Sequence, residues 1–225
     1  MENKNNRLSI RAVAFWGIFV IVIGGMIFGM IKAASYNSTS KKESLVLTSP
    51  ITAGDWVRGS KDAKVIIIEY SDFQCPACTY YYNLAKQAHK DFGDRIAIVY
   101  RHFPLRNIHA NADVAALSAE AAGKQNKFWE MHDMIFETQE NWKNEKNAQE
   151  IFIEYAGKLD LDAEQFKKDL DLKELKQKIE ADYQSGVTIG VNHTPTIFVN
   201  GIEIQNPKDY EEFKQIINYA ESKKS

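Results

Sequence analysis

The stretch VIIIEYSDFQCPAC, residues 65–78, decides the fold of this chain. Its first four residues are all β-branched, which is typical of a central strand covered on both faces. The polar residues that follow end the strand, and Pro76 suits the first turn of a helix because that turn does not need its missing N–H. We therefore expect a buried strand, a short turn, and a helix that Cys75 and Cys78 open.

This placement gives the first cysteine an unusual electrostatic environment. Cys75 meets the positive end of the helix dipole and several unpaired backbone N–H groups, which favour thiolate over thiol. We expect an exposed Cys75 sulfur with a lowered pKa, each pH unit of lowering being worth about 1.4 kcal/mol. Cys78 lies one turn later, where its sulfur can close a small disulfide with Cys75. Because a stabilised thiolate makes that disulfide easier to reduce, the two cysteines are predicted to be a redox pair.

A zinc site and an inert structural disulfide are the alternatives to a redox pair. Zinc needs four ligands, but the chain has no second CxxC motif and its five histidines form no cluster with ligand spacing. The two cysteines are neighbours, so they supply no disulfide framework. The redox role is favoured, and no metal is expected.

A distant Thr194-Pro195 adds to the strand–CPAC–helix unit, and together they resemble the DsbA-like branch of the thioredoxin superfamily. The likeness covers residues 55–225. It implies an α/β, thioredoxin-like fold with a helical insertion at about residues 105–188, and the activity of a protein thiol-disulfide oxidoreductase. Two further runs are similar to the insertion of that family: residues 101–105 and 127–133.

The resemblance also assigns a role to Glu69, which stands six positions before the first cysteine, where the family has a buried acidic residue. A buried Glu69 has a raised pKa and can exchange a proton with Cys78. An exposed residue on an edge strand is the alternative reading of Glu69.

Four residues around the cysteines are expected to contact the substrate or shape the site. The resemblance implies a cis Thr194–Pro195 bond that faces Cys75 and leaves the Thr194 backbone free to pair with an extended substrate. An ordinary trans proline is the alternative. Thr194 replaces the valine of the best-known periplasmic oxidase, and Ala77, beside Pro76, replaces the histidine of the strongest oxidase. Because Ala77 lacks the histidine donor to the thiolate, we expect a less oxidising couple than in that enzyme. Threonine at the position of Thr194 also occurs in isomerases and reductases, which leaves the direction of electron flow open.

The N-terminal part of the chain predicts a membrane anchor. Residues 1–11 are polar and basic and are expected in the cytoplasm, and residues 12–31 form an apolar run that can cross a hydrocarbon core of about 30 Å. Residues 32–54 are predicted to be a tether, within which residues 45–47 are a candidate edge strand. This arrangement places residues 55–225 on the extracytoplasmic side of the cell membrane as a single-pass protein. A cleaved signal peptide that ends near residues 33–35 is the alternative.

The remaining sequence supports one domain. The chain has 225 residues, and its net charge of −2 comes from charges of both signs scattered along the sequence. This pattern gives no sign of a nucleic-acid-binding surface.

Two local motifs predict where elements begin or turn. Asn200-Gly201 predicts a tight hairpin, and Asp162 predicts a helix N-cap. The expected elements after the first strand are helices at 79–89, 109–122, 127–139, 148–159, 162–170, 173–186 and 207–219, and strands at 95–102, 197–199 and 202–204.

Several aromatic and histidine residues could be mistaken for further site residues. The group Phe128, Trp129, Met131 and Phe136 is assigned to the core of the insertion. Tyr80 and Tyr81, beside the cysteines, are candidates to line a peptide groove. No catalytic role is assigned to three histidines, which are expected to be solvated or paired on helices: His102, His109 and His132.

The predicted function is the introduction of disulfides into cysteine-containing extracytoplasmic proteins. Reoxidation would need a membrane partner, by analogy a DsbB-like quinone-linked protein, and no diffusible cofactor is implied. Two alternatives are kept: a reductase or isomerase of the same fold, and a tethered peptide-binding or holdase module.

Overall fold

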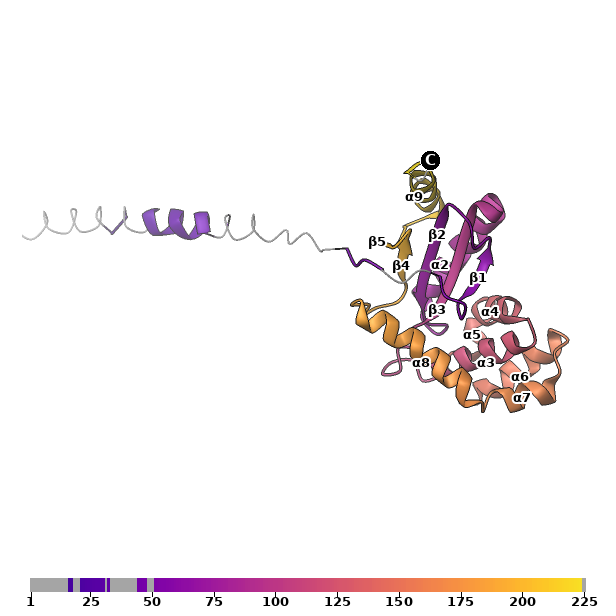
Figure 1. The fold of residues 1–225 in the computed structure, drawn as a ribbon. Helices are drawn as coiled ribbons and strands as arrows, with labels where there is room; N and C mark the ends of the chain where they lie inside the picture. The colour runs from indigo at the N-terminus through magenta and orange to yellow at the C-terminus, as the bar shows by residue number, and fades with distance from the viewer. Residues whose placement is uncertain (1–15, 18–20, 31, 33–43, 48–50, 224–225) are drawn as a thin grey trace, which may run out of the picture. The chain divides into compact units, whose positions relative to one another are not determined.

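The chain divides into two compact units, Met1–Glu43 and Ser44–Ser225. The elements that position the cysteines all belong to the second unit (Figure 1). The computed structural model describes residues 16–17, 21–30, 32, 44–47 and 51–223.

The predicted membrane span, residues 12–31, falls partly outside the described residues. Its described positions, 16–17 and 21–30, are helical. Within the part of the chain that the structure describes, no helix combines the length and the apolar character that crossing a bilayer requires. The span stays a prediction.

A single five-stranded sheet forms the centre of the described part of the second unit. Its strands are β1 (Trp56–Gly59), β2 (Val65–Ser71), β3 (Ile96–His102), β4 (Thr196–Val199) and β5 (Ile202–Ile204). Their order in the sheet is β1-β3-β2-β4-β5. β2 pairs in parallel with β3, as two strands joined by a crossover helix usually do, and antiparallel with β4. The strand that leads to the cysteines is therefore central, which explains its run of buried aliphatic residues.

A run of helices separates β3 from β4 along the chain. α3 to α8 follow one another between β3 and β4 and gather at one end of the sheet, which makes them the helical insertion (Figure 1). The helices are α2 (Pro76–Phe92), α3 (Ala112–Lys124), α4 (Phe128–Glu137), α5 (Gln139–Trp142), α6 (Ala148–Lys158), α7 (Ala163–Asp169), α8 (Lys173–Thr188) and α9 (Tyr210–Lys223).

Successive side chains of β2 point to opposite faces of the sheet, so they belong to two different hydrophobic cores. Val65 and Ile67 are buried with apolar residues of α2 and α9. Ile68 and Tyr70 are buried on the opposite face, in a cluster with residues of the segments that enter and leave the insertion. Because successive side chains of a strand point to opposite faces, Glu69 lies on the face of Val65 and Ile67, beneath α2.

The core of the insertion extends to the cysteines. Phe128, Met131 and Phe136 are buried and Trp129 is partly buried in one cluster, which confirms their assignment to the insertion core. The same cluster contains Cys75, Cys78, Phe73 and Tyr100. Packing of the insertion therefore fixes the surroundings of both sulfurs.

Two helices begin later than the sequence pattern predicts. α3 begins at Ala112 rather than at residue 109, because His109 lies in a turn where its side chain is bonded to Asp72. α9 begins at Tyr210 rather than at residue 207, because the Asp209 carboxylate accepts from the Glu212 N–H at 2.9 Å, as an N-cap does. The predicted N-cap at Asp162 is confirmed, since its carboxylate accepts from the N–H groups of Glu164 and Gln165.

The edge of the sheet at β5 is covered by the chain that precedes the domain. The predicted hairpin is confirmed, with Asn200 and Gly201 at positive φ between β4 and β5. Val46 forms an antiparallel bridge with Ile202, and the Leu47 N–H donates to the Gly201 carbonyl at 2.8 Å. Residues 45–47, the candidate edge strand within the predicted tether 32–54, thus pair with the edge of the sheet.

Candidate active site

Cys75 stands between β2 and α2, at the point where the chain turns from the sheet into a helix. It is the N-cap of α2, with extended backbone angles, and Pro76 is the first helical residue. Its carbonyl accepts from the N–H groups of Cys78 and Thr79 at 3.1 and 3.2 Å. The helix therefore begins at the first cysteine, as the sequence predicts.

The Cys75 sulfur is surrounded by donors that favour its thiolate form. Its pKa is lowered to about 5, first by a hydrogen bond from the Cys78 thiol, and then by the Thr194 side chain and the backbone N–H groups of Cys78 and Ala77. Burial acts in the opposite direction and does not overcome these donors. The Cys75 residue as a whole is largely buried, with 7% of its surface exposed. Packing of the insertion against the start of α2 accounts for this burial.

Cys78 has the opposite protonation behaviour. It is fully buried, and burial raises its pKa well above the ordinary value, with further contributions from the hydrogen bond to Cys75 and from the negative charges of Cys75 and Glu69. Both cysteines are free thiols in this structure. The pair therefore consists of one sulfur that prefers the thiolate and one that holds its proton.

Glu69 lies in β2, beneath the two cysteines. It is 3% exposed, and because β2 lies between β3 and β4, the alternative of an exposed edge residue is wrong. Burial raises the pKa of Glu69 to about 8, and the negative charge of Cys75 adds to the increase, while the Ser71 hydroxyl acts in the opposite direction. Among the described residues, its Oε1 atom has no hydrogen-bond partner. A carboxyl group in this environment is protonated at neutral pH and able to give its proton to a neighbouring sulfur.

The Thr194–Pro195 segment faces Cys75. The peptide bond between these residues is cis, so the alternative of a trans proline is wrong. The Cys75 thiol donates to the Thr194 carbonyl oxygen at 3.6 Å. In the thiolate form the sulfur instead accepts, and the Thr194 hydroxyl, which has no other partner among the described residues, is placed to donate to it.

A set of polar residues that the sequence analysis missed holds the turn before Cys75. The buried Asp72 carboxylate accepts from the N–H groups of Gln74 and Leu105 at 2.7 and 2.8 Å and is bonded to the His109 ring at 2.7 Å. These bonds tie the turn to the loop that follows β3. The pair Asp72 and Gln74 carries a local signal of this turn, because an aspartate often accepts from an N–H two residues later.

Gln139 and Asn111 extend this attachment to the insertion. The Gln139 side chain donates to the carbonyl oxygens of Phe73 at 2.7 Å and Cys75 at 3.1 Å. The Gln74 side chain accepts from the Asn111 N–H at 2.7 Å. No local pattern marks Gln139, since it is brought to the turn only by the packing of the insertion.

The three histidines without an assigned role are paired and largely buried rather than solvated. His102 lies on β3, not on a helix, and its ring is 2.9 Å from the Glu120 carboxylate. Burial lowers the pKa of His132 to about 4, although Asp133 opposes this effect. His109 holds Asp72, which makes it a positioning residue of the turn.

The two tyrosines beside the cysteines differ in exposure. Tyr80 is 50% exposed and remains a candidate to contact a peptide. Tyr81 is 2% exposed, so its proposed place in a surface groove is wrong. Its ring packs edge-on against Phe213 of α9, with centroids 5.3 Å apart, because this side of α2 faces the sheet.

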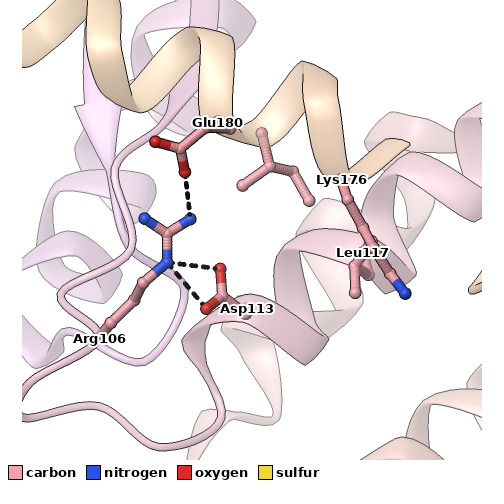
Figure 2. Close-up of a pocket in the computed structure, with 6 residues that line it drawn as sticks. Arg106, Asp113, Leu117, Lys176 and Glu180 are labelled. Atoms are coloured by element: carbon pink, nitrogen blue, oxygen red, sulfur yellow. Dashed lines mark hydrogen bonds and ion pairs between the residues drawn. The ribbon is translucent and has the colours of Figure 1, made fainter. Parts of the chain in front are cut away.

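A surface cavity of about 520 Å³, which neither cysteine lines, lies against α3 and α8 (Figure 2). Arg106 extends into it and is held by Asp113 at 2.9 Å and Glu180 at 3.1 Å, while Leu117 and Ile179 supply apolar lining. The ion pairs attach the loop after β3 to two helices of the insertion. Among the described residues, no group of three or more histidine, cysteine or acidic side chains is arranged to hold a metal ion.

A protein-family model and solved structures both match this chain. Residues 52–219 match the family model described as thioredoxin. Oxidised BdbD from Bacillus subtilis superposes with a TM-score of 0.70 and 26% identity, over 80% of this chain and 100% of that chain. Alpha-DsbA1 from Wolbachia pipientis gives a TM-score of 0.68 and 20% identity, over 77% of this chain and 94% of that chain, which is a likeness of fold.

Curated relatives with similar sequences are much longer than this chain. The Na(+)/H(+) antiporter NhaA 1 of Mycolicibacterium vanbaalenii is 32% identical over 200 residues, which are 86% of this chain and 31% of that protein. The protein of the same name from Salinispora arenicola is 40% identical over 147 residues, 65% of this chain and 22% of that protein. The chain thus spans a third or less of the length of these relatives.

Proposed function

Since this chain belongs to the thioredoxin family and is a DsbA-like protein thiol-disulfide oxidoreductase, we propose that it introduces disulfide bonds into extracytoplasmic proteins. The observation that carries the proposal is the opposite protonation of two neighbouring sulfurs. The pKa of Cys75 is lowered to about 5, and that of Cys78 is raised by burial. A stabilised thiolate favours the reduced enzyme, and this makes the enzyme disulfide an oxidant.

The reaction begins with the Cys75–Cys78 disulfide. A substrate thiolate attacks the Cys75 sulfur, the bond between the two cysteines breaks, and its electron pair leaves on Cys78, which takes up a proton. A second substrate thiolate attacks the substrate sulfur of the mixed disulfide and releases the Cys75 thiolate. Two electrons have then moved from the substrate to the enzyme.

Neighbouring residues have distinct roles in this proposal. Glu69 supplies the proton that Cys78 takes up, because its carboxyl group is buried and protonated at neutral pH. Thr194 and Pro195 receive the substrate backbone beside the Cys75 sulfur, and the Thr194 hydroxyl donates to the thiolate. Pro76 and Ala77 form the surface between the cysteines.

The location and the redox partner are part of the same proposal. Residues 12–31 anchor the chain in the cell membrane and residues 1–11 stay in the cytoplasm, so the cysteine pair works on the extracytoplasmic side, where disulfides persist. Its clients are cysteine-containing proteins of that compartment. A DsbB-like membrane protein reoxidises the pair, by analogy with the family.

Two residues favour a second candidate, the reductase or isomerase direction. Ala77 offers no side-chain donor to the thiolate, and Thr194 replaces the valine of a strong oxidase. The missing donor at Ala77 lowers the expected oxidising power of the couple, and a threonine at position 194 also occurs in isomerases and reductases of the family. A holdase that only binds peptides is the third candidate, and it would form no mixed disulfides.

The reduction potential of the full chain, purified in detergent, separates the first two candidates. The protein is equilibrated with glutathione redox buffers, quenched with acid, and its thiols are alkylated and counted by mass spectrometry. A value above about −200 mV is expected for the oxidase, whereas a value below about −250 mV would support the reductase.

Trapping tests whether the chain exchanges disulfides with proteins at all. Cys78→Ser removes the resolving sulfur, so mixed disulfides between Cys75 and reduced client proteins should accumulate. Cys75→Ser is the matched control and should trap nothing. If neither variant formed mixed disulfides with client proteins, the exchange function would be refuted and peptide binding would be the function that remains.

A further inference from the structure

Four polar groups beneath α2 are buried and unpaired. Glu69 Oε1 and the hydroxyl groups of Ser71, Tyr81 and Tyr100 have no hydrogen-bond partner among the described residues, and none of these four residues is more than 3% exposed. Buried polar groups are nearly always paired, so each unpaired group calls for an explanation. Their concentration beside a reactive thiol indicates a role in the reaction.

The sheet brings Ser71 and Tyr100 to the Glu69 carboxyl group. Glu69 pairs with Tyr100 in the parallel register of β2 and β3, so the two side chains are neighbours on one face of the sheet. Ser71 follows Glu69 by two residues and therefore lies on the same face. The Tyr100 ring is held by stacking on Phe73, with centroids 5.0 Å apart.

The pKa shifts of Glu69 and Tyr100 agree with this placement of the side chains. Burial raises the pKa of Tyr100, and the Glu69 and Cys78 charges raise it further. The Ser71 hydroxyl lowers the pKa values of both Glu69 and Tyr100. Ser71 therefore lies close to both groups, and the Tyr100 hydroxyl lies in the electric field of the Glu69 and Cys78 charges. Both hydroxyl groups are free to rotate their O–H toward a carboxylate once one forms.

We propose that Ser71 and Tyr100 are positioning residues that stabilise the Glu69 carboxylate after Glu69 has given its proton to Cys78. The inference rests on the proposed role of Glu69 and extends it to two residues that act through Glu69.

The step conserves charge. When the disulfide bond breaks, its electron pair leaves on the Cys78 sulfur, and the proton moves from the Glu69 carboxyl group to that sulfur. A negative charge then rests on a carboxylate in an apolar core, where an unpaired charge is costly. Because Ser71 and Tyr100 donate strongly only to the ionised form, they stabilise the state after proton transfer more than the state before it.

The pH profile of disulfide reduction tests this inference. The oxidised full chain in detergent is mixed with reduced glutathione between pH 6 and pH 9.5, and loss of the disulfide is followed by acid quenching, alkylation and mass spectrometry. The rate constant is divided by the glutathione thiolate fraction at each pH. In the wild type, this corrected rate should fall through an inflection where Glu69 loses its proton.

Tyr100→Phe and Ser71→Ala each remove one donor without adding volume. Each should lower the corrected rate on the low-pH side about tenfold, since a hydrogen bond to a charged group is lost, and should move the inflection upward by about one pH unit. Glu69→Gln should remove the inflection. Tyr82→Phe is the matched control, because the Tyr82 hydroxyl bonds to Glu137 at 2.8 Å, away from Glu69, and its profile should match the wild type.

Partial unfolding of a variant would not produce the same shift of the inflection. A smaller folded fraction lowers the rate but leaves the pH of the inflection unchanged. An inflection that stays in place in both Tyr100→Phe and Ser71→Ala overturns the inference while thiol exchange stands. A wild-type chain that glutathione does not reduce overturns the exchange function, and this inference with it.

Discussion

Glu69→Gln is expected to stabilise the reduced full chain at neutral pH. Burial raises the pKa of Glu69 to about 8, whereas the same carboxyl group in an unfolded chain titrates near 4.5. At pH 7 the folded chain holds a proton that the unfolded chain has released. This proton is kept about 2.5 pH units above the pKa of the unfolded chain. At about 1.4 kcal/mol for each pH unit, it lowers the free energy of unfolding by about 3.5 kcal/mol. Glutamine cannot ionise, so the variant avoids this cost.

The stability difference between Glu69→Gln and the wild type should grow as the pH rises. A carboxyl group whose folded pKa is raised destabilises the fold increasingly as pH rises from about 4.5 to about 8. The advantage of Glu69→Gln should therefore be near zero at pH 4.5 and largest near pH 8. The lowered pKa of Cys75 acts in the opposite direction, adding stability as pH rises above about 5, but it is present in both proteins and largely cancels in their difference.

Urea unfolding of the reduced chain at several pH values, followed by tryptophan fluorescence, measures this difference. Glu211→Gln, on the exposed side of α9, is the matched control and should leave the curves unchanged. If Glu69→Gln were no more stable than the wild type at pH 7, or if its advantage did not grow with pH, the assignment of a buried, protonated carboxyl group would be refuted.

Three further results are expected. Iodoacetamide should alkylate Cys75 with a midpoint near pH 5, and a midpoint near that of free cysteine would contradict the donor arrangement. Ala77→His should raise the reduction potential in glutathione buffers, because a cationic ring between the cysteines favours the thiolate; a fall, or no change, would contradict the electrostatic account. Gly123→Ala should destabilise the fold by about 1–3 kcal/mol in urea unfolding, since its Cβ would lie 2.4 Å from the Trp56 ring. Gly157→Ala, with no atom within 4 Å of the added Cβ, should instead be neutral or stabilising by about 0.5 kcal/mol, and equal losses in both variants would refute the packing argument.

Local chemistry along the chain was sufficient to predict the strand, the turn and the helix around the cysteines. A run of aliphatic residues, a proline at a helix start and the two cysteines are short-range features, and they require β2, the turn and α2 in that order. The same holds for the Asn200-Gly201 hairpin, because positive φ at two adjacent positions is a local preference. The lowered pKa of Cys75 was predicted for the same reason, since a helix N-terminus provides backbone donors wherever it lies.

The sequence by itself thus determined the chemistry of the sulfur pair and the order of the elements, because both depend on neighbours within a few residues. Only the tertiary structure decided what surrounds that pair. The insertion buries Cys75, Gln139 reaches the turn from 64 residues away, and the β2–β3 register sets Tyr100 beside Glu69. These contacts join residues whose proximity depends on long-range packing and strand register, which no local propensity encodes.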